Sequence, residues 1–74
     1  MNLENLTKGE RFVFEWQYGM AGSFHETLAM AFQRADTGNF LRLSEGFPEE
    51  GEAMWKFANE CGWWENVLEK VGMK

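Results

Sequence analysis

The side chains suited to acid–base or metal chemistry are few and widely spaced. His25 is the only histidine and Cys61 the only cysteine, and 36 positions separate them. A zinc site needs several such ligands at short spacing, and a general base needs a nucleophile or a polarised water within reach. Neither pattern occurs around His25. We therefore expect no catalytic residue, no metal site and no cofactor, with His25 at the surface or half-buried.

Glutamates at helical spacing offer a second place for chemistry. Glu45, Glu49 and Glu52 are four and three positions apart, so a helix could present their carboxylates together to bind a hard cation or to act as an acid–base pair. Pro48 suits the first position of a helix, and acidic residues in a first turn favour the helix dipole. The start of a helix therefore already explains Glu49 and Glu50, which weakens the case for a catalytic or metal-binding role of the group. We expect that the protein is not an enzyme.

The charge of the chain is concentrated in its second half. Twelve acidic residues against seven basic ones give a net charge of −5, and residues 45–69 alone hold seven glutamates against Lys56, a net charge of −6. Phosphate contacts need a basic face, so direct binding to nucleic acid is disfavoured. Two interpretations stay open: a solvated surface that keeps the protein soluble, or an acidic surface that docks on a basic groove of a partner protein.

Helical periodicity predicts an all-α fold, a compact bundle of four or five short helices in a single domain, residues 1–74. The segment Ser23–Asp36 is expected to be the central helix, with Ser23 and Glu26 as a capping box and Gly38 or Asn39 as a left-handed end. Further helices are expected near residues 40–46, from Pro48, and over residues 63–71. The apolar stripe of the central helix comprises Phe24, Leu28, Ala31, Phe32 and Ala35.

The segment 7–18 fits two structures. Thr7 and Glu10 form a capping box before a helical apolar face, whereas Phe12, Phe14, Trp16 and Tyr18 alternate as in a strand. A strand needs a partner for its backbone groups, and the chain offers no second strand. The alternative fold is therefore α+β, with strand 12–18 pairing in a homodimer.

Two tryptophans are candidates for an exposed surface. Trp55 lies off the apolar stripe of its helix. Cys61 lies on that stripe and is expected to be buried as a small hydrophobe. Trp63 precedes the inward Trp64 and either faces solvent or closes over the Gly62 turn to complete the core. Exposed rings among acidic residues are typical of a protein interface. The predicted protein-binding site comprises Glu49, Glu50, Glu52, Trp55, Glu60 and Trp63.

The chain carries no pattern of an exported or membrane protein. The first 20 residues lack an uninterrupted apolar core, and there is no run of about 18 apolar residues to span a membrane. A single cysteine excludes an intramolecular disulfide. These features favour a cytoplasmic protein without a membrane partner.

Several short stretches together resemble small, uncharacterised acidic proteins of bacterial phages and prophages, over about residues 16–68. The resemblance rests on Gly22-Ser23-Phe24, Arg34-Ala35-Asp36 with Asn39, Gly46-Phe47-Pro48-Glu49-Glu50 and Gly62-Trp63-Trp64. It implies a phage origin and action in the host cell, and it carries over no functional residue. We expect a protein-binding module, an inhibitor of a nucleic-acid-binding host defence protein of the anti-CRISPR or anti-restriction type. The alternative is a structural or assembly protein of a phage that self-associates through its aromatic residues.

Overall fold

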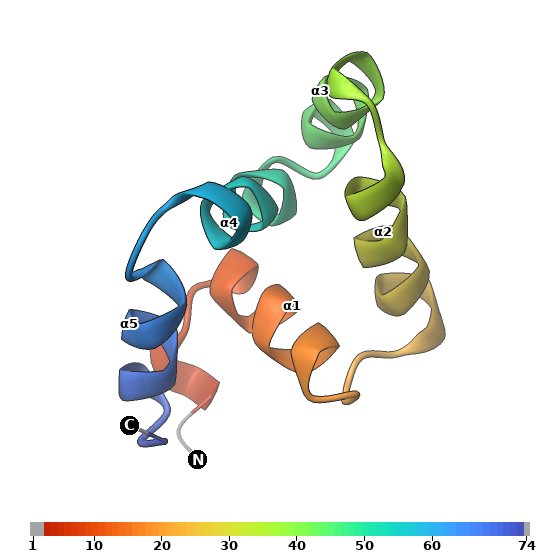
Figure 1. Cartoon of the computed structure of the whole chain (residues 1–74). Helices are drawn as coiled ribbons and strands as arrows, with labels where there is room; N and C mark the ends of the chain where they lie inside the picture. The colour runs from red at the N-terminus through yellow and green to blue at the C-terminus, as the bar shows by residue number, and fades with distance from the viewer. Residues whose placement is uncertain (1–2, 74) are drawn as a thin grey trace.

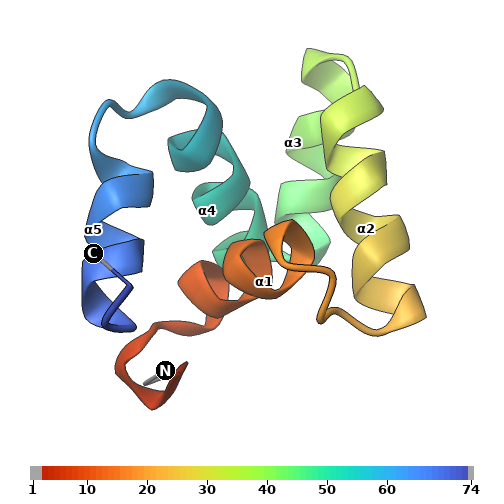
Figure 2. The same ribbon diagram turned by 60° about the horizontal axis from the view of Figure 1, so that its bottom comes forward.

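The computed structural model describes residues 3–73 and contains five α-helices in this part of the chain (Figures 1 and 2). This confirms the all-α prediction, and the alternative strand at residues 12–18 is wrong. Among residues 3–73 no helix is both long and apolar enough to cross a membrane. A short 3₁₀ helix, Leu3–Asn5, precedes the five helices, which are α1 Lys8–Gln17, α2 Ser23–Arg34, α3 Thr37–Gly46, α4 Pro48–Asn59 and α5 Trp63–Lys70.

The capping box decides the structure of α1. The Glu10 amide donates to Thr7 Oγ1 at 3.2 Å, and the Thr7 amide donates to Glu10 Oε1 at 2.9 Å. These two bonds satisfy amides that the first turn leaves unpaired. Three consecutive side chains then enter the core, Phe12, Val13 and Phe14. A strand would send alternate residues to opposite faces. Burial of three residues in a row instead fits a helix that is covered by its neighbours on more than one side.

The helix at the centre of the domain is α4, which contacts α1, α2, α3 and α5. The prediction that the segment Ser23–Asp36 is central is wrong. Within α2, Leu28 and Phe32 are buried, but Phe24 is 62% exposed. The central place goes to α4 because small residues let its neighbours approach: Gly9 of α1 lies so close that a Cβ there would be 2.5 Å from the Glu49 carbonyl oxygen.

The ends of α2 also differ from the predicted ones. Gly22 is the N-cap of α2 and no side chain caps that helix, so the predicted Ser23–Glu26 capping box is wrong. At the other end, Asp36 Oδ1 accepts from the Asn39 amide at 2.8 Å and caps α3. Because Asp36 starts a new helix at once, α3 begins at residue 37 and neither Gly38 nor Asn39 adopts a left-handed conformation.

Aromatic side chains build most of the core. Nine of the twelve aromatic residues are buried in the core or packed against it, and three are exposed, namely Tyr18, Phe24 and Trp55. The accessible surface is 4824 Å², close to the value of about 4700 Å² that the area–mass relation gives for a monomer of this size. The aromatic excess is thus accounted for mainly by the core. Leu3 and Leu6, which precede α1, also pack against this core.

Candidate protein-binding groove

A groove lies between α3 and α4 and has a volume of about 580 Å³. Each helix lines it with one face, because residues three and four apart lie on the same side of a helix. From α3 these are Thr37, Phe40, Leu41 and Ser44; from α4 they are Pro48, Gly51, Glu52, Met54, Trp55, Ala58 and Asn59; and Ala35 and Asp36 complete the lining.

The groove is closed at one end and open at the other. Only Phe47 separates α3 from α4, and the two helices leave this link in different directions (Figure 1). Near the link they touch: a Cβ added at Gly51 would lie 2.8 Å from the Ser44 Cβ and 3.0 Å from its Cα. Away from the link, the start of α3 at Thr37 and the end of α4 at Asn59 form the open end.

Exposed apolar side chains form the edges of the groove. Trp55 of α4 is 55% exposed and Leu41 of α3 is 62% exposed, whereas Met54 is buried and Phe40 packs against the core. The prediction that Trp55 is exposed is confirmed. Sequence reasoning missed Leu41, because its position about 100° from Phe40 on the same helix indicates only that it faces another side. The position of α4 is what makes Leu41 an edge of the groove. An apolar floor between two exposed apolar edges is a surface that a partner can cover.

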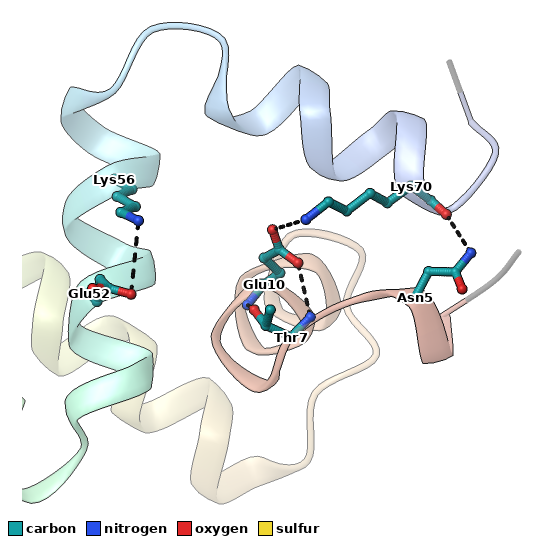
Figure 3. Close-up of polar contacts among 6 residues, drawn as sticks. All are labelled: Asn5, Thr7, Glu10, Glu52, Lys56 and Lys70. Atoms are coloured by element: carbon teal, nitrogen blue, oxygen red, sulfur yellow. Dashed lines mark hydrogen bonds and ion pairs between the residues drawn. The ribbon is translucent and has the colours of Figure 1, made fainter.

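Two of the predicted site residues belong to the groove, namely Trp55 and Glu52. Glu52 is exposed and lies 3.9 Å from Lys56 Nζ, one turn along α4 (Figure 3). Asp36, which was not among the predicted site residues, adds a second carboxylate to the groove lining. It directly precedes the start of α3, at the open end of the groove. Glu60 is exposed and follows the last residue of α4.

The structure corrects the predicted role of Glu50. Only 3% of this residue is exposed, because it occupies the first turn of α4 on the side that meets α1. Its carboxylate lies 3.8 Å from Lys8 Nζ, and the exposed Glu49 lies equally far from the same lysine. A partner can therefore reach Glu49 but not Glu50, and Lys8 offsets part of the charge of both.

The expectation that Trp63 is exposed is also wrong. Trp63 is 7% exposed, since Gly62, at φ +86°, turns the chain so that the first residue of α5 packs on Phe57 with ring centroids 6.4 Å apart. The alternative, in which Trp63 completes the core, is the confirmed one. The prediction that Cys61 is buried is wrong as well. Cys61 is exposed, because α4 ends at Asn59 and its buried stripe does not extend to residue 61.

The remaining candidates for chemistry do not converge. His25 is exposed and stands edge-on to Phe12, with ring centroids 5.5 Å apart, which confirms its predicted surface position. Within residues 3–73, no group of three or more histidine, cysteine or acidic side chains is arranged to hold a metal ion.

Glu10 belongs to a structural clasp between the two ends of the chain (Figure 3). Lys70 Nζ of α5 donates to Glu10 Oε2 at 2.6 Å, and Asn5 Nδ2 donates to the Lys70 carbonyl oxygen at 3.2 Å. Burial alone raises the pKa of Glu10, but the bonds from Lys70 and Thr7 and the charge of Lys70 together outweigh burial and leave the pKa lowered. The carboxylate is thus held ionised to cap α1 and to fasten α5, which is a structural role.

Comparison with known proteins supplies no relative from which a function could be transferred. No protein-family model, no curated protein and no solved structure matches this chain.

Proposed function

We propose that this chain is a non-enzymatic protein-binding domain whose α3–α4 groove receives an apolar segment of a partner protein. One observation carries the proposal: Trp55 and Leu41 stand exposed on either side of an apolar floor. Isolated exposed apolar residues are normal on a protein surface, but a tryptophan at the edge of a concave apolar site is typical of an interface hot spot.

The charge around the groove indicates a basic partner. Asp36 and Glu52 line the groove. Glu45 and Glu60, which directly follow the lining residues Ser44 and Asn59 in the sequence, are also exposed. Complementary charge of this kind speeds association and selects partners more than it adds affinity. A basic host protein, such as the target of an anti-CRISPR or anti-restriction inhibitor from a phage, is one partner of this type.

Imitation of a phosphate row receives less support than docking in the groove. Glu50 is buried, and Lys8 pairs with both Glu49 and Glu50, so these glutamates do not present an unbroken row of free charges. The aromatic excess that motivated a self-associating structural protein lies mainly in the core. Docking of a partner in the groove is therefore the proposed function with the stronger support.

Site-specific photocrosslinking tests the proposal. A benzophenone amino acid is placed at position 41 on the edge of the groove, and at position 69 on the exposed side of α5 as a control, in cells that express the protein naturally. We expect a discrete covalent adduct from position 41 alone. The adduct should be lost in the Trp55→Ala variant and retained in Phe24→Ala, which removes a similarly exposed aromatic ring outside the groove. Adducts that form equally from position 69, or that survive Trp55→Ala, would overturn the proposal.

A further inference from the structure

From the shape, hydrogen bonding and charge of the groove, we infer that its occupant is a short amphipathic helix carrying basic residues. This inference rests on the proposed function and names the class of partner segment. It places the occupant as a third helix beside α3 and α4, with its apolar face on Phe40 and Met54 and its basic residues toward Asp36 and Glu52.

The dimensions of the groove suit a helix. The α4 lining runs from Pro48 to Asn59, a length of about 16 Å at 1.5 Å per residue. A helical segment of about eleven residues, or three turns, has the same length and presents apolar side chains at i, i+3 or i+4, and i+7. The α3 lining has this same spacing, from Thr37 through Phe40 and Leu41 to Ser44.

Hydrogen bonding disfavours an extended occupant. A bound strand must pair its backbone amides and carbonyls with a sheet edge or leave them in water, and both walls of this groove are helices whose backbone groups pair internally outside their first and last turns. Even at the end of α4 the carbonyls have partners: the Trp55 carbonyl accepts from Asn59 Nδ2 at 2.9 Å, and the Lys56 carbonyl accepts from the Glu60 amide at 2.8 Å. A helix brings its own backbone bonds and needs none from the groove.

Charge disfavours a second copy of this chain as the occupant. The protein carries a net charge of −5, with −6 in residues 45–69, so two copies that meet at their grooves bring like charges together. Lysine or arginine on the occupant would instead meet Asp36 and also Glu52, which is exposed and whose charge Lys56 offsets only in part at 3.9 Å. The carboxylate of Asp36 caps α3 through one oxygen, Oδ1, and a carboxylate oxygen can accept more than one hydrogen bond.

Selection from a library of random 12-residue peptides tests the inference on the intact protein, with Trp55→Ala protein as the counter-target. We expect enriched sequences with apolar residues at i, i+3 or i+4, and i+7 and with at least one lysine or arginine. A synthetic copy of one such peptide should gain ellipticity at 222 nm on mixing and should bind Trp55→Ala about tenfold or more weakly, the scale of a hot-spot truncation. The Phe24→Ala protein should bind it unchanged.

The outcomes separate the inference from the proposed function. Enrichment of proline-rich, extended or acidic peptides would overturn the helical, basic occupant while groove crosslinks from position 41 still support protein binding. Peptides that bind wild type and Trp55→Ala equally, together with a dimer in light scattering that Trp55→Ala dissolves, would show that a second copy occupies the groove. Loss of the crosslinks themselves would overturn the function and, with it, the inference.

Discussion

Gly51→Ala tests the contact that sets the closed end of the groove. The new methyl group would lie 2.8 Å from the Ser44 Cβ and 3.0 Å from the Ser44 Cα, besides meeting the hydroxyl. Rotation of the serine side chain relieves only the hydroxyl contact, because the other two atoms are fixed to α3. Carbon atoms favour separations of about 3.5–4.0 Å, so α3 must move away from α4 by roughly 1 Å.

Two opposing effects set the size of the change. Forcing an extra methyl group into a packed contact costs about 1–3 kcal/mol, whereas replacing a glycine inside a helix by alanine contributes about 1 kcal/mol in the other direction. We expect a net loss of about 1 kcal/mol in the free energy of unfolding, which lowers the Tm by about 4–8 °C in a domain of this size. Denaturant and thermal unfolding followed by circular dichroism measure both quantities.

Two further variants distinguish steric conflict from a general effect of glycine. Gly46→Ala changes a glycine at the end of α3 with nothing within 4 Å of the new Cβ, so it should leave stability unchanged or raise it. Ser44→Gly removes the Cβ and hydroxyl from the contact, so Gly51→Ala in that background should lose most of its cost. A Gly51→Ala protein as stable as wild type, or a loss of stability that Ser44→Gly does not reduce, would contradict a steric conflict between α3 and α4.

Two other substitutions test the contacts that hold α1. Gly9→Ala places a Cβ 2.5 Å from the Glu49 carbonyl oxygen and 3.0 Å from the Ala53 Cβ, and neither atom can rotate away. We expect the free energy of unfolding, measured by chemical denaturation, to fall by about 2 kcal/mol. An unchanged denaturation midpoint would refute this prediction. Lys70→Met removes the bond to Glu10, and since Lys70 is partly exposed we expect a loss of about 1 kcal/mol at neutral pH. Because the pKa of Glu10 is lowered from 4.5, the stability that this pair contributes is present above about pH 4.5 and is lost as the pH falls through the lowered pKa. Unfolding curves of the two proteins should therefore converge at low pH, while Lys56→Met, which removes the looser pair with Glu52 at 3.9 Å, should change little at any pH.

Local signals in the sequence were reliable where one residue fixes the backbone. The Thr7–Glu10 capping box and Pro48 at the first position of α4 both stand where their chemistry predicts. The helical fold class follows from such signals. The Ser23–Glu26 box failed because a capping sequence is compatible with more than one start, and Gly22 takes the N-cap position there.

The burial of single side chains was harder to predict because it depends on contacts between helices. Glu50 is buried where α4 meets α1, beside Lys8, which is distant in sequence. Trp63 is buried because the left-handed Gly62 turns the chain before α5. The periodicity of apolar residues within one helix predicts neither the burial of Glu50 nor that of Trp63. Trp55 was predicted correctly because it lies away from the stripe of its own helix, whereas Leu41 needed the position of α4 to stand out as one edge of a groove.

Small residues explain why this short chain has a groove at all. Gly9 and Gly51 bring α1 and α3 into close contact with α4, and five of the nine aromatic residues of the core belong to α1 and α5. Since α3 touches α4 closely at Ser44 and diverges beyond it, the divergent part needs a large side chain to fill it. The chain instead places Trp55 and Leu41 at its exposed edges. The proposed partner segment would fill this groove, which the domain leaves open although it packs most of its aromatic residues in the core.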